Sequence, residues 1–250
     1  MISLYTGTPG SGKSLDVARM TYVKLKLGKT VIGNLRVKPE KIKNCRGKYI
    51  YVDTYRMNPR DFINYAELFH KKGQEHQTYI VIDECQQIFN SRDWASKGRR
   101  AWNDFFQVHR HYGFDVWLVT QYDRLIDRQL RALVEYDYIH RKVSNFGIKG
   151  KLLALIFKGG LFVKVAEWYP VHESTGSEFF TYKKKYGDFY DSYASFSDAE
   201  TLVVDELYPL IQAKILELET NDAENTEETE SGDPVADEWG LEGPHDAATG

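Results

Sequence analysis

Short apolar runs alternate with longer segments in which apolar residues recur every three or four positions over the first half of the chain. The runs predict buried strands, and the spacing predicts amphipathic helices, as at residues 13–27, where Leu15, Ala18 and Tyr22 share one face. Alternating strands and helices are typical of an α/β fold, a mostly parallel sheet with helices on both faces. The predicted strands are residues 2–6, 30–34, 49–53, 79–83 and 115–120, and the further predicted helices are residues 59–73 and 100–111.

The pattern changes after about residue 136. Residues 138–143, 151–157 and 161–168 are short apolar runs separated only by glycine-containing turns, and they predict an antiparallel β extension. We expect this extension to belong to the same domain as the parallel sheet. The expected division is a core at residues 1–135, the antiparallel and aromatic extension at 136–196, a partly helical segment at 197–219 and a disordered tail at 220–250.

Charge divides the chain into a basic body and an acidic tail. Residues 217–250 hold 12 of the 36 acidic residues and no Lys or Arg, so residues 1–216 carry 33 basic against 24 acidic side chains. A tail rich in Glu, Asp, Thr, Asn and Gly buries too little apolar surface to offset its ordering entropy, which predicts disorder. The basic body favours an anionic partner such as nucleic acid or a lipid surface.

Composition favours a cytoplasmic protein. The longest apolar run is residues 152–157, far shorter than the roughly 20 residues of a membrane helix, so no transmembrane segment is expected. Cys45 and Cys85 are the only cysteines, and they form no metal-binding CxxC pair.

A phosphate-binding loop lies between the first predicted strand and helix. The sequence GTPGSGKS matches the pattern GxxxxGK[ST], in which glycines let backbone N–H groups converge on phosphate at a helix N-terminus. Lys13 is placed to reach the β- and γ-phosphates of ATP, and the Ser14 hydroxyl to bind Mg²⁺. The predicted nucleotide-binding residues are Gly7, Thr8, Pro9, Gly10, Ser11, Gly12, Lys13 and Ser14.

Two carboxylates follow the apolar strand at residues 79–83. Parallel sheets bind ligands at the carboxyl ends of their strands, so Asp83 is a candidate Mg²⁺ ligand together with Ser14. Glu84 is the candidate general base that activates the attacking water. This pair favours an ATP hydrolase over a small-molecule kinase.

Three further residues are catalytic candidates with ordinary alternatives. Gln121 ends the strand at 115–120 and is a candidate sensor of the γ-phosphate, the alternative being an exposed turn residue. Arg128 and Arg131 are candidates for an arginine donated to a neighbouring subunit's site, and no sequence feature chooses between them or Arg124. Solvated helix arginines are the alternative reading.

These residues together resemble a known family. The segment from Ile2 to Ser14, the strand into Asp83 and Glu84, and His109-Arg110-His111 followed by Thr120-Gln121 resemble the Zot family, the zonula occludens toxin-like assembly ATPases of filamentous phages. The likeness covers roughly residues 1–195. Family members usually continue into a membrane helix and an extracytoplasmic domain, whereas this sequence continues into the acidic tail.

The resemblance implies a P-loop ATPase of the ASCE or RecA-like type that uses ATP and Mg²⁺. It further implies a homo-oligomeric ring at the cytoplasmic face of the membrane that extrudes phage DNA with a membrane-bound assembly partner. The alternative is a nucleotide-switched adaptor that binds a partner without pumping DNA.

Overall fold

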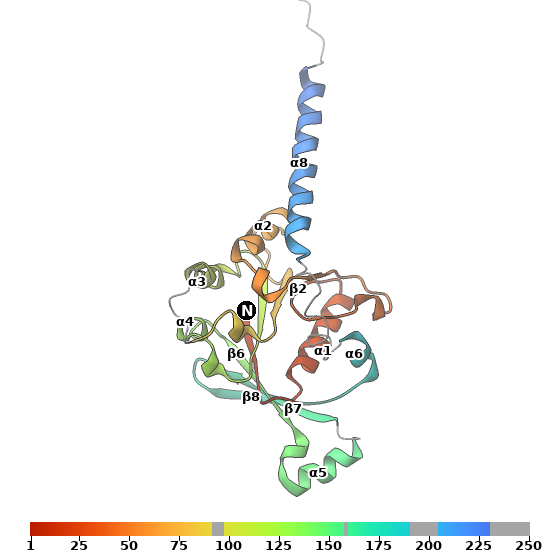
Figure 1. Ribbon diagram of the computed structural model, residues 1–250, viewed down its shortest axis with the longest axis vertical. Coiled ribbons are helices and arrows are strands. Elements are labelled where there is room, and N and C mark those ends of the chain that lie inside the picture. The colour runs from red at the N-terminus through yellow and green to blue at the C-terminus, as the bar shows by residue number, and fades with distance from the viewer. Residues whose placement is uncertain (92–97, 158–159, 191–204, 231–250) are drawn as a thin grey trace, which may run out of the picture. The chain divides into compact units, whose positions relative to one another are not determined.

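The computed structural model describes residues 1–91, 98–157, 160–190 and 205–230, and residues Met1–Ile211 form one compact unit. This unit is built on an eight-stranded sheet with the strand order β3-β2-β4-β5-β1-β6-β7-β8 (Figure 1). The strands are β1 (Ile2–Thr6), β2 (Thr30–Gly33), β3 (Tyr49–Tyr51), β4 (Thr78–Ile82), β5 (Phe114–Val119), β6 (Tyr136–Lys142), β7 (Leu161–Trp168) and β8 (Glu173–Thr181).

Strands β3 to β6 of this order are paired in parallel, and β7 and β8 are added antiparallel at one edge. The predicted α/β class with an antiparallel extension is therefore confirmed. The extension continues the same sheet, because β6 pairs in parallel with β1 and antiparallel with β7. Strand β5 lies between β1 and β4, so the residues that follow these three strands emerge side by side at one edge.

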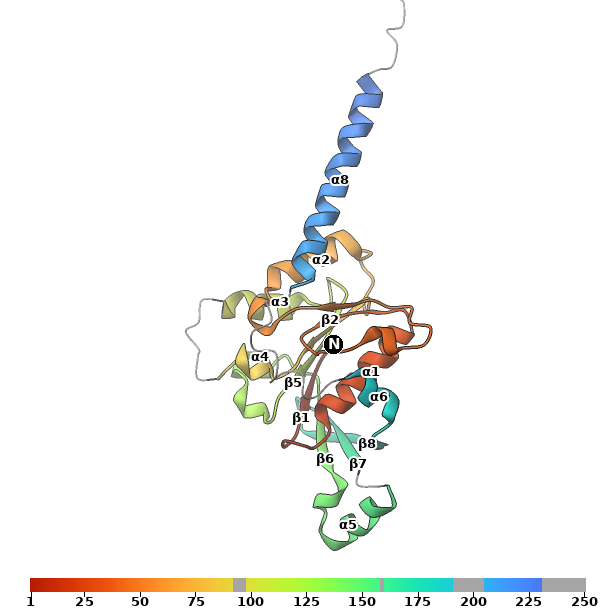
Figure 2. The same cartoon turned by 45° about the vertical axis from the view of Figure 1, so that its right-hand side comes forward.

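Helices cover both faces of the sheet (Figure 2). On one face, Val17, Ala18 and Leu25 of α1 pack with Phe189 of α6 against Trp117 of the sheet. The helices of the unit are α1 (Lys13–Lys26), α2 (Pro59–Phe69), α3 (Arg99–Val108), α4 (Arg128–Arg131), α5 (Gly147–Ile156) and α6 (Lys184–Phe189).

Aromatic rings fill the opposite face. Phe62 of α2 stacks on Phe105 of α3 at a centroid distance of 5.7 Å, and both rings contact Phe114 of β5. Pairs of this kind add stability beyond the area that they bury. The two apolar layers hold the sheet rigid, so that its carboxyl edge can present side chains in fixed positions.

The strand predicted at residues 151–157 is wrong. Residues Gly147–Ile156 form helix α5, which lies between β6 and β7. An apolar run of this length does not distinguish a strand from a helix by periodicity, and the run is rich in Leu and Ala, which favour a helix. The helix also meets the chain closely at Gly150, where a Cβ would lie 2.2 Å from the Val143 carbonyl oxygen.

The disorder predicted from residue 220 is wrong up to residue 230. Helix α8 spans Leu207–Glu230, because Glu and Ala are good helix formers and no Gly or Pro interrupts the sequence between Pro209 and Gly232. Residues 191–204, part of the predicted aromatic and helical segments, and tail residues 231–250 lie outside the described residues. Of the helices that the structure describes, none combines the length and apolar character required to cross a membrane.

Candidate functional site

A glycine-rich loop joins β1 to the N-terminus of α1. Gly7 and Gly12 have φ values of 142° and 96°, which favour glycine. A Cβ on Gly7 would lie 2.4 Å from the His140 carbonyl oxygen, and a Cβ on Gly12 would lie 2.7 Å from a ring carbon of Phe162. The loop is therefore held against β6 and β7, and it ends where a helix N-terminus favours an anion.

Lys13 is folded onto this loop. Its Nζ donates to the carbonyl oxygens of Gly7, at 2.6 Å, and Thr8, at 3.2 Å. Burial lowers the pKa of Lys13, while the nearby charges of Glu84 and Asp83 raise it. The ammonium is thus a buried cation held by neutral carbonyl groups, and a phosphate oxygen would be a stronger, charge-assisted partner.

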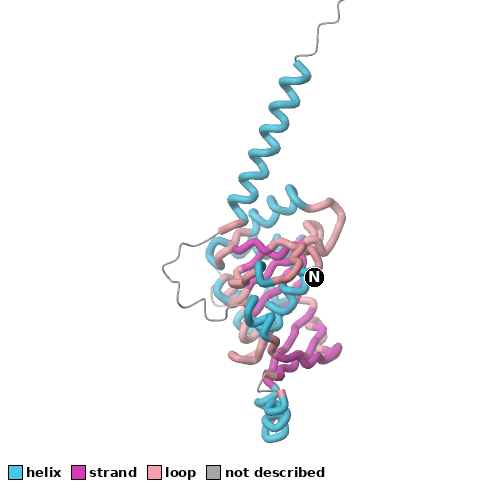
Figure 3. The backbone as a smooth tube through the Cα atoms, turned by 90° about the vertical axis from the view of Figure 1, so that its right-hand side faces the viewer, coloured by secondary structure: helices cyan, strands magenta, loops and turns pink. Residues whose placement is uncertain are grey.

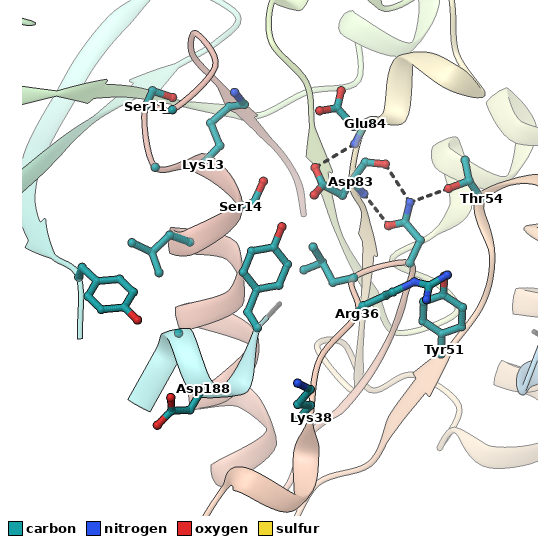
Figure 4. Close-up of a pocket in the computed structure, with 18 of the residues that line it drawn as sticks. Ser11, Lys13, Ser14, Arg36, Lys38, Tyr51, Thr54, Asp83, Glu84 and Asp188 are labelled. Carbon is teal, nitrogen blue, oxygen red and sulfur yellow. Dashed lines mark hydrogen bonds between the residues drawn. The ribbon is translucent and has the colours of Figure 1, made fainter. Parts of the chain in front are cut away.

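Asp83 lies across the cavity from the loop (Figure 4). Its carboxylate accepts a hydrogen bond from the backbone N–H of Glu84 at 2.9 Å, and another from the Ser14 hydroxyl. Burial and the charge of Glu84 raise the pKa of Asp83 to about 6. A hydroxyl and a carboxylate side by side are the oxygen ligands that Mg²⁺ prefers, so the two side chains fit the predicted metal site.

Glu84 follows in a left-handed backbone conformation with φ 49°. This conformation turns the chain sharply after β4 and presents the carboxylate toward the loop side of the cavity (Figure 4). The Gln86 amide donates to its Oε2 atom. The structure therefore brings the predicted base together with the predicted phosphate loop and metal ligands.

The cavity that holds these groups has a volume of about 1470 Å³. Its floor is formed by residues 10–15 of the loop and helix α1. This volume exceeds the 300–1000 Å³ of a typical small-ligand site, so it has room for a nucleotide and its water shell. Side chains from outside the predicted motifs that line it include Arg36, Lys38, Tyr51, Thr54, Tyr182 and Asp188.

Gln121 lies beside the loop through its backbone. Its carbonyl oxygen accepts the Gly7 N–H at 3.2 Å. Because β5 lies between β1 and β4, Gln121 emerges between the loop and the Asp83-Glu84 pair. Its role as a sensor stays a prediction.

The two predicted arginines differ in their surroundings. Arg131 lies 3.6 Å from the Asp123 carboxylate and is hydrogen-bonded to Tyr169, whose hydroxyl also donates to Asp123 at 3.0 Å. Arg128 is exposed at the start of α4. Of the four predicted catalytic residues, all of them in the described part of the chain, Glu84 alone lines the cavity.

A sequence model of the family described as zonular occludens toxin (Zot) matches residues 1–195. The chain belongs to the Zot family. Among its relatives, the Gene 1 protein of Enterobacteria phage I2-2 is 31% identical over 170 residues, which is 64% of this chain and 46% of the relative. The Gene 1 protein of Salmonella phage IKe is 29% identical over the same shares. This Zot-family chain therefore spans about half the length of these phage relatives.

Solved structures show the same fold. The N-terminal domain of zonular occludens toxin from Neisseria meningitidis has a TM-score of 0.50 and 24% identity, over 76% of this chain and 98% of that domain. A second solved structure, the ATPase domain of another protein, has a TM-score of 0.51 and 8% identity, over 76% of this chain and 84% of that domain. The Zot-family chain thus has the P-loop NTPase fold.

Asn34 is a site residue that the sequence motifs did not indicate. Its side chain accepts the Asp83 N–H at 2.7 Å and donates to the Asp83 carbonyl at 2.8 Å, as well as to the Thr54 hydroxyl at 2.8 Å (Figure 4). It follows β2, the neighbour of β4, so its position at the carboxyl edge of the sheet was the available signal. In this Zot-family chain, Asn34 fixes the backbone that carries both carboxylates.

A buried ionic network ties α1 to the antiparallel strands. Asp16 of α1 is fully buried, and its carboxylate lies 3.1 Å from His140 of β6, 3.3 Å from Lys164 of β7 and 2.7 Å from Arg19. Glu178 of β8 pairs with both Arg19 and Lys164. Burial alone would raise the pKa of Asp16, but the His140 hydrogen bond and the Lys164 and Arg19 charges lower it to about 2. The phosphate loop and strands β6 to β8 therefore form one electrostatically bonded body.

Asp137 predicts a pH dependence of stability. It is buried, its carboxylate accepts from the Thr6 hydroxyl, and burial raises its pKa to about 7. Because the folded pKa is raised, the native state binds more protons than the unfolded state, and stability falls as pH rises toward 7. Asp137→Asn should therefore remove a loss of up to about 3 kcal/mol between pH 5 and pH 8.

Urea unfolding of both proteins at pH 5 and pH 8 measures this loss. The exposed Asp104 provides the control, since Asp104→Asn should leave the pH profile unchanged. If the wild type and Asp137→Asn showed parallel profiles, Asp137 would not titrate in this range.

Proposed function

We propose that this chain is an ATP hydrolase. The observation that carries the proposal is the placement of Lys13 and Ser14 across one cavity from Asp83 and Glu84. The Ser11 hydroxyl supports nucleotide binding, because within the described residues it is buried in the loop and has no hydrogen-bond partner. A bound phosphate would supply such a partner.

Each residue then has a distinct role. Lys13 leaves the loop carbonyls and binds the β- and γ-phosphate oxygens of ATP. Ser14 and Asp83 would hold Mg²⁺, which when bound neutralises charge on the phosphates and keeps Asp83 ionised. Glu84 takes a proton from the attacking water, and Gln121 orients that water or the γ-phosphate.

We further propose that the active form is a homo-oligomeric ring in which Arg128 completes a neighbour's site. Arg128 is exposed, whereas Arg131 is already held by Asp123 and Tyr169. A guanidinium suits this role because it is always charged and donates in a fixed fork.

The proposed setting is filamentous-phage assembly at the cytoplasmic face of the host membrane. Family membership and the phage relatives support it. In this setting ATP hydrolysis drives the extrusion of phage DNA, together with a membrane-bound assembly partner. The alternative is a nucleotide-switched adaptor, in which the network from α1 to β8 reports the nucleotide state to a partner.

ATP turnover with and without DNA tests this function. The motor predicts turnover that single- or double-stranded DNA stimulates, and Arg128→Ala should lower the turnover number without weakening ATP binding. Lys26→Ala, at another exposed cation, is the matched control. Slow turnover that DNA leaves unchanged, with partner binding that follows the nucleotide, would favour the adaptor.

Asn34 provides a test of how the carboxylates are held. Asn34→Ala removes the hydrogen bonds that fix Asp83, so we expect the turnover number to fall by roughly 10- to 100-fold. The Kd for ATP should change little, since Lys13 and the loop are untouched. Asn103→Ala, which removes a surface amide bonded to Gln129, is the control. An equal loss in Kd and turnover would instead indicate a general loss of structure.

A further inference from the structure

Helix α5 and its flanks form a tip that extends beyond the paired ends of β6 and β7 (Figures 1 and 3). We call residues 146–157 the hairpin tip. It is a folded element, because Gly150 packs on the Val143 carbonyl and donates its N–H to Phe146, and Ala154 is buried. Val143 packs in turn with Leu161 and Val163 at the base of the tip.

The hairpin tip exposes large apolar side chains. Ile148, Leu152 and Ile156 are 86%, 65% and 72% exposed. They are spaced by four residues, so they form one stripe along the helix. Phe146, Leu153 and Phe157 are also exposed, by 48%, 40% and 46%. An exposed apolar cluster of this size marks an interaction surface rather than part of the core.

The charges around this stripe are all positive. No Asp or Glu occurs between Asp137 and Glu167. Lys149 and Lys151 are exposed on the helix itself, and Arg141 is exposed at its base. An apolar stripe flanked only by cations complements a surface with an apolar interior and an anionic boundary.

We propose that the hairpin tip inserts into the interface of an anionic lipid bilayer. Ile148, Leu152 and Ile156 enter the boundary of the acyl chains, and Lys149 and Lys151 contact the phosphate headgroups. Such a contact is reversible, since one short helix buries too little apolar area for permanent anchoring. The inference rests on the membrane location in the proposed function and names the segment that makes the contact.

Co-sedimentation with lipid vesicles tests this inference. The full 250-residue chain should bind vesicles of phosphatidylcholine with about one quarter phosphatidylglycerol, and bind pure phosphatidylcholine far more weakly. The triple variant Ile148→Ser, Leu152→Ser, Ile156→Ser should bind the anionic vesicles at least roughly tenfold more weakly. Lys149→Gln with Lys151→Gln should weaken the same binding roughly 30-fold and reduce its salt dependence.

Matched variants control for general changes in hydrophobicity and charge. Leu27→Ser with Val171→Ser alters exposed apolar residues elsewhere, and Lys26→Gln with Lys72→Gln alters exposed cations elsewhere. Both should bind as the wild type does. Equal binding by the wild type and the triple variant would overturn the proposal. So would vesicle binding that is absent in every form while the triple variant abolishes self-association in sedimentation, which would assign the tip to a second copy of the chain.

The nucleotide site can be tested separately. Vesicle binding is measured without nucleotide and ATP turnover without vesicles, so Lys13→Ala should retain vesicle binding. The triple variant should retain ATP binding, because the hairpin tip does not line the cavity. Failure of one proposal therefore leaves a signal for the other.

Discussion

Replacing Lys13 with alanine is expected to weaken Mg-ATP binding by at least about 100-fold. The Lys13 ammonium is the buried cation at the centre of the loop, and its Nζ is 2.6 Å from the Gly7 carbonyl that a phosphate would displace. Isothermal titration with a non-hydrolysable ATP analogue measures the loss.

The control for Lys13 is Lys26→Ala in the same helix, which removes an exposed ammonium and should leave the Kd unchanged. Thermal unfolding of both variants checks that the fold is retained. Binding by Lys13→Ala equal to that of the wild type would contradict the assignment of the loop.

Replacing Glu84 with glutamine is expected to leave ATP bound and uncleaved. Glutamine keeps the size of the side chain and its ability to accept from Gln86, but it cannot take a proton from water. The single-turnover rate should fall by about 10²- to 10⁴-fold, with the Kd for ATP within a small factor of the wild type.

The exposed Glu67 provides the matched substitution, Glu67→Gln, which should turn over normally. If Glu84→Gln lost ATP binding as severely as Lys13→Ala, Glu84 would be a metal ligand or a structural residue.

The local parts of the site could be predicted from the sequence. The loop pattern at residues 7–14 and the carboxylates after residues 79–83 depend on short segments whose geometry is fixed by neighbours in the chain. Parallel strands then bring the two segments to one edge of the sheet, which accounts for the agreement between the predicted and observed positions of Lys13, Ser14 and Asp83.

The missed features depend on contacts between distant segments. The hydrogen bonds from Asn34 reach Asp83, 49 residues away, and the partners of Asp16 come from strands more than 120 residues later. Helix α5 was predicted as a strand because an apolar run without clear periodicity fits both structures. Its exposed stripe could not be recognised until the structure showed which side chains the body leaves uncovered.

The central claim is that the cavity between the phosphate loop and the Asp83-Glu84 pair hydrolyses ATP. The most direct test is steady-state phosphate release by the full chain with ATP, with and without Mg²⁺, beside Lys13→Ala and Glu84→Gln. We predict Mg²⁺-dependent release by the wild type and release near background by both variants. Release that continues unchanged in both variants would contradict the claim, as would a wild-type protein that neither binds nor hydrolyses ATP.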